Sequence, residues 1–357
     1  MHAEAREITG SVGNLASSVK CAVSPASFPT IRCDMRIFNK TVTFILLAVA
    51  ASSVALAQDY PNRSIRFIVP WPAGGLNDVL ARAYNERVAK SLGQAIVNDF
   101  KPGAGGRIGV ELGAKAAPDG YTLVMGNLGP LTIYPHLYKN MPYDAKKSFV
   151  PVTMFAVSPL VLVVNNALPV KSVQDLFQLA RAKPGQLNFA SVGTGTAQHL
   201  IFEMFRNRDN IQMLHVPYKG TNESLPAMYD AQIQAMFDTL PSMLPHIRSG
   251  KIRALAVTTP KRLEQLPEVP TMAEAGYPAV DVFTWYAVMV PAGTPKDIVN
   301  RLYAEYTGAA QTPEVKKFLL EQGLVYLPNT PEQFAQRMEA ESQRWEKLIR
   351  EGGIKVE

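Results

Sequence analysis

Val69-Pro70-Trp71-Pro72-Ala73-Gly74-Gly75-Leu76-Asn77-Asp78 is the stretch of this 357-residue chain that decides its fold. The β-branched run before it, 65–69, predicts a strand, and the apolar spacing that begins at Asp78 predicts a helix. Two prolines and two glycines lie between them, so the pattern is strand, glycine-rich turn, helix. The first turn of a helix carries unpaired amide N–H groups and a partial positive charge, which suits a carboxylate or phosphate. An ordinary turn that binds nothing is the alternative.

Two more glycine clusters follow predicted strands. Ser191-Val192-Gly193-Thr194-Gly195-Thr196 follows a strand at 187–190 and precedes a helix from about Ala197. Lys101-Pro102-Gly103-Ala104-Gly105-Gly106 follows a strand at 95–100. Three such turns occur in a chain of alternating strands and helices. This pattern is typical of a ligand-binding crevice at the carboxyl edge of parallel sheets.

The rest of the chain alternates in the same way, which implies an α/β architecture. The apolar run 149–164 contains Pro151 and Pro159, and we interpret it as two short strands. Ser172, Thr294 and Thr330 mark the starts of later helices. Strands are expected at 65–69, 95–100, 122–126, 152–156, 160–164, 187–190, 213–217, 234–237, 253–257 and 285–290.

The N-terminal region indicates export. Residues 35–57 have a short basic segment, an apolar alanine-rich run and the sequence Ala55-Leu56-Ala57 before Gln58, the layout of a cleavable signal peptide. A membrane anchor is the weaker alternative, because the run is shorter than the ~20 residues that span a bilayer. Residues 1–34 are interpreted as an upstream extension. We therefore expect a periplasmic protein.

Composition excludes several classes for the mature chain, residues 58–357. Both cysteines, Cys21 and Cys33, precede the cleavage site, which excludes disulfides, a thiol nucleophile and cysteine-bound metal. Residues 1–57 hold five Lys/Arg and three Asp/Glu, so the mature net charge is (36 − 5) − (30 − 3) = +4. No run of five basic residues occurs, which argues against nucleic acid. We expect a monomer without stable membrane insertion, cofactor or metal.

Eight short motifs occur in order from Tyr60 to Pro295. They are Tyr60-Pro61 with 65–78, 101–109, Asp119-Gly120-Tyr121-Thr122-Leu123, 191–199, Val216-Pro217-Tyr218-Lys219-Gly220, 250–258, 266–276 and Pro291-Ala292-Gly293-Thr294-Pro295. In this order and spacing they resemble the Bug family of periplasmic solute-binding receptors. These are the extracytoplasmic components of tripartite tricarboxylate transport systems.

The resemblance implies a two-lobed, hinged fold of the periplasmic-binding-protein type. Such a receptor closes on a small carboxylate-bearing organic acid and passes it to the membrane components of the transporter, or signals its presence. The chain is then expected to cross between lobes near 163–165 and 281–284. Lobe one is expected at 59–163 plus 283–357, and lobe two at 164–282.

In the family, loops from both lobes grip the carboxylate. Carried onto this chain, these loops are 73–78 and 191–196, flanked by His199 and Asp238, with 126–130 as a further part of the wall. With two aromatic departures from the family pattern, the expected ligand-binding residues are Trp71, Ala73, Gly74, Gly75, Asn77, Asp78, Asn127, Gly129, Tyr134, Ser191, Gly193, Thr194, Gly195, Thr196, His199 and Asp238.

The departures bear on the ligand. Trp71 stands where the family usually has Phe, Phe100 and Tyr134 where it usually has Asn, and Tyr286 where Phe is common. If Trp71 and Tyr134 face the cleft, a ligand with an apolar or aromatic body becomes more plausible. Packing in the core of a lobe is the alternative. For Phe100 and Tyr286, packing in the core is the favoured interpretation.

Three site residues also have structural interpretations. Asp78 can cap its helix, His199 can be a packed side chain, and Asp238 would repel a carboxylate and so orient water or pair with an ammonium group.

An exported enzyme acting on a small organic acid is the competing functional class. The sequence contains no G-x-S-x-G elbow, no dinucleotide fingerprint and no phosphate-binding P-loop. We therefore expect no catalytic residues.

Overall fold

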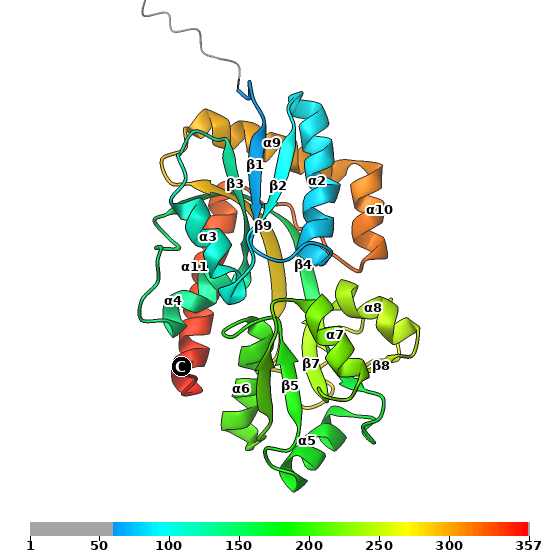
Figure 1. Ribbon diagram of the computed structural model, residues 1–357. Coiled ribbons are helices and arrows are strands. Elements are labelled where there is room, and N and C mark those ends of the chain that lie inside the picture. Colours follow the sequence, from blue (N-terminus) through cyan, green and yellow to red (C-terminus); the bar gives the residue numbers. More distant parts are fainter. Residues whose placement is uncertain (1–59, 356–357) are drawn as a thin grey trace, which may run out of the picture. The chain divides into compact units, whose positions relative to one another are not determined.

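The computed structural model of the chain describes residues 60–355. The expected signal peptide and upstream extension lie outside the described residues. Within them the strands form two sheets that share one long strand, which makes them one continuous sheet of nine strands, and each sheet with its helices makes one lobe (Figure 1).

The first lobe is built on parallel strands with glycine-rich turns at their carboxyl ends. The strands β2, β1 and β3 pair in that order and all run parallel, and β9 joins β3 antiparallel. Their bounds are β1 (Ile65–Val69), β2 (Ile96–Phe100), β3 (Thr122–Asn127) and β9 (Phe283–Pro291). The helical elements are α2 (Leu76–Leu92), η1 (Ala104–Gly106), α3 (Arg107–Ala114), η2 (Gly129–Ile133), α4 (Tyr134–Leu137), α9 (Lys296–Gln311), α10 (Pro313–Glu321) and α11 (Pro331–Glu351).

The second lobe is also built on parallel strands with a glycine-rich turn at a carboxyl end, here the three strands β6, β5 and β7. Strand β5 pairs parallel with both β6 and β7, and its carboxyl end leads into the second glycine-rich turn. The strands are β5 (Asn188–Ser191), β6 (Leu214–Pro217), β7 (Ala235–Thr239) and β8 (Ile252–Val257). The helices are α5 (Val173–Ala182), α6 (Ala197–Asp209), α7 (Thr221–Tyr229) and α8 (Leu240–Arg248).

The prediction of two short strands at 152–156 and 160–164 was wrong, because β4 runs unbroken over Phe149–Asn165. Up to Pro159 the strand pairs with β9, and from Leu160 it pairs with β7 and β8. The register shifts beside Pro151, where an irregularity accommodates the missing N–H. Pro159 lies where the strand changes partners. Neither proline therefore interrupts the strand.

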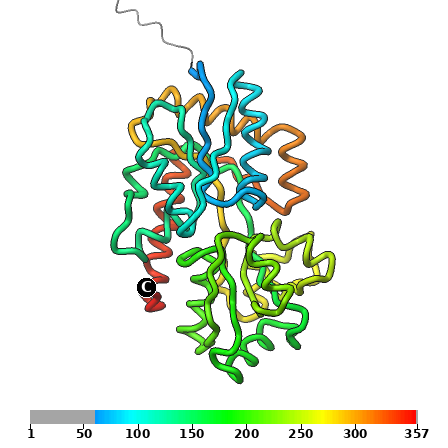
Figure 2. The backbone as a smooth tube through the Cα atoms, in the orientation of Figure 1, coloured from blue at the N-terminus to red at the C-terminus, as the bar shows by residue number. Residues whose placement is uncertain are grey.

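Strands β4 and β9 also carry the chain between the lobes, as the tube in Figure 2 shows. The partner change in β4 lies between Pro159 and Leu160, and β9 begins at Phe283. The expected lobe bounds, 59–163 plus 283–357 and 164–282, stay a prediction.

Aromatic side chains fill the core of both lobes, and the core of the second lobe continues into the first. In the first lobe Phe67, Tyr84 and Tyr306 pack between the sheet and helices α2 and α9, and all three are fully buried or nearly so. In the second lobe Phe177, Phe189, Phe202, Phe205 and Phe237 fill the space under α5 and α6. These cores hold the two glycine-rich turns facing the space between the lobes.

Candidate functional site

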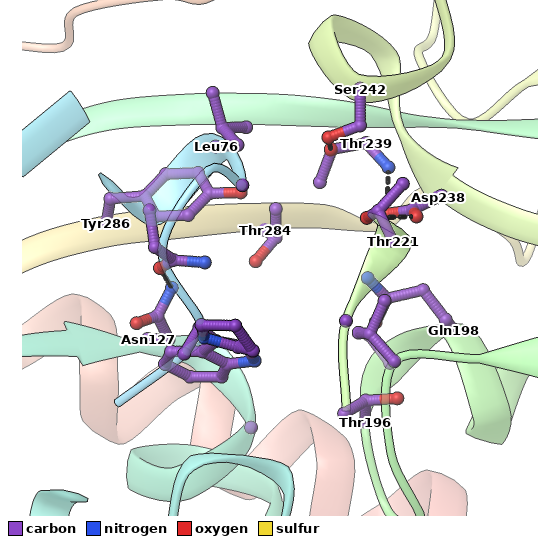
Figure 3. A pocket seen from close by; sticks show the side chains of 18 of the residues that line it. Leu76, Asn127, Thr196, Gln198, Thr221, Asp238, Thr239, Ser242, Thr284 and Tyr286 are labelled. Carbon is purple, nitrogen blue, oxygen red and sulfur yellow. Dashed lines mark hydrogen bonds between the residues drawn. The ribbon is translucent and has the colours of Figure 1, made fainter. Parts of the chain in front are cut away.

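A cavity lies between the lobes, where the strands β1, β3, β5 and β7 end. It contains about 770 Å³ of space free of protein atoms, its open mouth included. Figure 3 shows Tyr286 and Asn127 on one side of it, Asp238 and Gln198 on the other, and Thr284 between them.

Four helices begin at the cavity wall. The N-cap residues of α2, α6, α7 and α8 all line it, and so does at least one first-turn residue of each helix. The N-cap residues are Gly75, Thr196, Gly220 and Thr239. Within residues 60–355, no side chain caps any of these four helices. Their first-turn amides therefore add a partial positive charge around one space, which favours an anionic group.

The lining contains no Lys, Arg or His among the described residues, and its two acids are Glu223 and Asp238. A bound carboxylate would therefore depend on backbone amides, hydroxyls and side-chain amides. The first lobe supplies most of the apolar surface, and the second supplies most of the polar surface. The apolar residues are Trp71, Pro72, Leu76, Leu128, Pro130 and Tyr286, and the polar ones are Thr196, Gln198, Thr221, Asn222, Thr239 and Ser242.

Asp238, at the end of β7, is 1% exposed. Its Oδ2 accepts a hydrogen bond of 2.6 Å from the Thr221 hydroxyl, and its Oδ1 accepts one of 2.7 Å from the Thr239 amide. Burial raises the pKa of the Asp238 carboxyl to about 6, against these hydrogen bonds, which lower it. Asp238 thus connects the first turns of α7 and α8 and places an acid in the cavity wall.

Asn127, at the end of β3, is 4% exposed. Its side-chain amide donates to Asn77 Oδ1 over 3.2 Å. Its own Oδ1 has no hydrogen-bond partner within the described part of the chain. The cavity wall therefore holds a buried acceptor that a ligand or water can satisfy.

Half of the expected ligand-binding residues line this cavity. They are Trp71, Ala73, Gly75, Asn77, Asn127, Gly129, Thr196 and Asp238. Their positions follow from the turns after β1, β3, β5 and β7.

Asp78 and Gly74 stabilise the glycine-rich turn 73–78 by a hydrogen bond and do not line the cavity. Asp78 Oδ2 accepts the Gly74 amide over 2.8 Å, and its Oδ1 accepts Arg82 Nε over 2.6 Å. Gly74 lines a neighbouring groove with Asn222 and not the cavity itself. Asp78 thus orders the loop that leads into α2.

The interior of the turn 191–196 also faces away from the cavity. Ser191 Oγ lies 2.6 Å from His215 Nε2, and His199 Nδ1 accepts the Gly195 amide over 3.1 Å. The rings of His199 and His215 stack at 3.9 Å, and burial lowers the pKa of His215 to about 3. Neither Ser191 nor His215 lines the cavity.

The third glycine cluster meets the second one across the lobes. Gly193 has φ +136°, and a Cβ there would lie 3.1 Å from Gly105 Cα. The Tyr138 hydroxyl donates to the Thr194 carbonyl over 3.1 Å. These residues form a contact between lobes beside the cavity and do not line it.

Tyr134 belongs to the same contact. It is fully buried, its hydroxyl donates to the Gly105 carbonyl over 2.7 Å, and its ring packs beside Gly129 and Gly195. Trp71, by contrast, lines the cavity and packs against Gly106. Of these two departures from the family pattern, Trp71 therefore lies in the cavity wall and Tyr134 lies in the contact between the lobes.

Sequence reasoning missed the contribution of α7 and α8. The cavity wall also includes Gln198, Gly220, Thr221, Asn222, Glu223, Thr239, Ser242, Thr284 and Tyr286. The motif Val216-Pro217-Tyr218-Lys219-Gly220 before α7 repeats the order of strand, glycine and helix, and it could have located this part of the wall. Thr284 carries no such signal. Tyr286 is an aromatic departure from the family pattern for which core packing was the favoured interpretation, and it lines the cavity.

Neither a metal site nor a membrane-spanning helix occurs within residues 60–355. No group of three or more His, Cys, Asp or Glu side chains in that range could hold a metal ion. In the same range, no helix is both long enough and apolar enough to cross a bilayer.

Comparison with known proteins gives a family match over residues 80–354, to the tripartite tricarboxylate transporter family receptor. The periplasmic binding protein BugD is 31% identical, with a TM-score of 0.79 over 84% of this chain and 100% of that one. The protein Rpa4515 of R. palustris, solved with adipate, is 35% identical, with a TM-score of 0.80 over 83% and 99%. MatC (Rpa3494) of Rhodopseudomonas palustris, solved with malate, is 30% identical, with a TM-score of 0.78 over 81% and 100%.

Proposed function

Because the chain belongs to the family of tripartite tricarboxylate transporter receptors, we propose that it captures a small carboxylate-bearing organic acid between its two lobes. It then delivers this acid to the membrane components of a tripartite tricarboxylate-type transporter. The observation that carries the proposal is the convergence of four helix N-termini on one cavity without a basic side chain among the described lining residues.

Support for the ligand class comes from the two solved relatives with adipate and malate, which are both small organic acids. For this chain we propose that Gly75, Asn77, Asn127 and Thr196 contact the ligand, with Trp71 as an apolar wall. The lobes that close on it are 59–163 plus 283–357 and 164–282.

We place the receptor in the periplasm, after removal of residues 1–57. The relative BugD is a periplasmic binding protein, and the segment before Gln58 has the signal layout. Intact-mass measurement of the exported protein should give a chain that begins at Gln58.

Native mass spectrometry of the freshly purified protein is the test of ligand capture. We expect a mass increment that matches one small organic acid, and calorimetry with that acid should give one site per chain. Binding of no small acid from a panel that includes adipate and malate would contradict the proposal.

A sensor that signals the presence of the acid, and an exported enzyme that acts on it, are the competing functions. An enzyme would turn the bound acid over, whereas a receptor returns it unchanged. Incubation of the protein with its ligand, followed by mass spectrometry of the released acid, distinguishes an enzyme from a receptor.

A further inference from the structure

Beside the cavity, a glycine turn of the second lobe lies directly against the first lobe. A Cβ at Gly193 would lie 3.1 Å from Gly105 Cα. A Cβ at Gly195 would lie 3.0 Å from Tyr134 Cε1 and 3.2 Å from the Tyr138 hydroxyl oxygen. Both glycines of the turn also have positive φ, +136° and +83°. Glycine at these two positions therefore allows the turn to approach the first lobe this closely.

Tyr138, which follows α4, makes a hydrogen bond across this contact. Its hydroxyl donates to the Thr194 carbonyl over 3.1 Å. Its ring is held by two neighbours: the Tyr134 ring meets it edge-on, with 5.4 Å between centroids, and Arg107 Cζ lies 3.9 Å from its centroid. Because both neighbours belong to the first lobe, the hydroxyl is oriented toward the second lobe before the two lobes meet.

The turn that accepts this hydrogen bond continues into the cavity wall. Thr196 lines the cavity and is the N-cap residue of α6. Its hydroxyl donates to the Gly193 carbonyl over 2.7 Å, which connects the two ends of the turn. Tyr138 does not itself line the cavity. It can therefore influence a bound ligand only through the turn and through the position of the second lobe.

We propose that Tyr138 is a positioning residue of the receptor: its bond to Thr194 stabilises the closed lobes and so raises the affinity for a ligand that Tyr138 does not touch. This inference rests on the proposed capture of an organic acid between the lobes. The acid leaves when the lobes separate, and their separation breaks this bond. A bond that exists only in the closed form raises the population of that form, and the apparent affinity rises with it.

The variant Tyr138→Phe tests this role, because it removes the hydroxyl and keeps the ring. The dissociation constant should rise about two- to tenfold, as expected for one hydrogen bond between neutral groups. The dissociation rate should rise by the same factor at an unchanged association rate, because the bond forms after the acid has entered. Calorimetry and stopped-flow fluorescence on the full exported protein measure these quantities. The probes are adipate and malate or, if neither binds the parent protein, the acid that native mass spectrometry identifies.

The matched control is Tyr60→Phe. The Tyr60 hydroxyl donates to the Gly120 carbonyl over 2.7 Å, and its ring meets that of Tyr121 edge-on at 5.3 Å. Tyr60 is half-buried like Tyr138, but it and its two partners lie in the first lobe and do not line the cavity. Tyr60→Phe should therefore leave the dissociation constant and the dissociation rate unchanged. Urea unfolding establishes that both variants fold.

The outcomes separate this inference from the proposed function. If Tyr138→Phe binds and releases the acid as the parent protein does, or if Tyr60→Phe changes both quantities equally, the inference is wrong while ligand capture stands. If no small acid binds the parent protein, the proposed function fails and the inference fails with it.

Discussion

Gly75 is the residue at which the first turn becomes helix α2. Its backbone is extended, with φ −88°, and a Cβ there would have Pro72 O at 3.8 Å as its nearest neighbour. The fold therefore has room for a side chain, whereas a ligand held by the first amides of α2 does not. We expect Gly75→Val to fold normally and to lose ligand binding by calorimetry. Gly308→Val, at an exposed site in α9, is the matched control, and full affinity in both variants would contradict this role.

Trp71 and Tyr134 should respond differently to substitution. Trp71→Phe reduces an apolar wall of the cavity, so affinity for an acid with an aromatic body should fall several-fold, as expected for about 0.5–1.5 kcal/mol. Tyr134→Phe removes the bond to the Gly105 carbonyl and should lower the free energy of unfolding by about 0.5–1.5 kcal/mol. Calorimetry and urea unfolding measure the two effects. Loss of ligand selectivity in Tyr134→Phe, with unchanged stability, would show that this residue faces the ligand.

Asp238 should make stability depend on pH. Its pKa is raised from 3.8 to about 6 in the folded protein, so the folded state keeps this proton to higher pH than the unfolded chain. The free energy of unfolding should therefore fall as pH rises from about 4 to about 6, by about 3 kcal/mol for this group alone. Asp238→Asn lacks this dependence, so urea unfolding should show the parent protein losing stability relative to the variant over that range. A constant difference would be evidence against the shift.

At the scale of elements, the helices at the cavity differ from α5 in how they begin. The four helices at the cavity begin without a side-chain cap within the described residues, whereas α5 begins with a capping box. There Ser172 Oγ accepts the Asp175 amide over 3.0 Å, and Asp175 Oδ2 accepts the Ser172 amide over 3.1 Å. Helices α10 and α11 also begin with a side-chain cap, whereas α3 and α9 begin without one although they do not line the cavity.

Ser172→Ala tests that difference. Loss of an N-cap costs about 1 kcal/mol, so the free energy of unfolding in urea should fall by that amount. Ligand affinity should stay the same, because α5 does not line the cavity. A fall in affinity that matches the fall in stability would contradict the separation of structural and ligand-binding helix starts.

At the scale of the whole molecule, the lobes are joined by β4 and β9 and touch beside the cavity. Gly193 lies against Gly105 on one side of it, and a Cβ at Gly74 would lie 3.2 Å from Asn222 Nδ2 on another. Two crossing strands permit a hinge motion, and closure on a ligand would form these contacts.

Small-angle scattering tests this motion. The radius of gyration of the exported protein should be smaller with saturating ligand than without it. An equal radius at a concentration that calorimetry shows to be saturating would mean that the lobes do not move on binding.

The sequence by itself determined the elements whose causes are local. The strand at 65–69, the capped helix after Ser172 and the glycine-rich turns were predicted, because periodicity, capping and turn chemistry act over a few neighbouring residues. The order of motifs also carried the family and the two-lobed fold.

Only the tertiary structure decided which residues of those turns face the cavity. Tyr134 meets Gly105, and Asp238 meets Thr221, through packing between segments that are separate in the sequence. The long strand β4 likewise continues through Pro151 and Pro159 because β9, β7 and β8 supply its partners in turn. Contacts of this kind depend on how the two sheets are placed, and no local pattern along the chain encodes that placement.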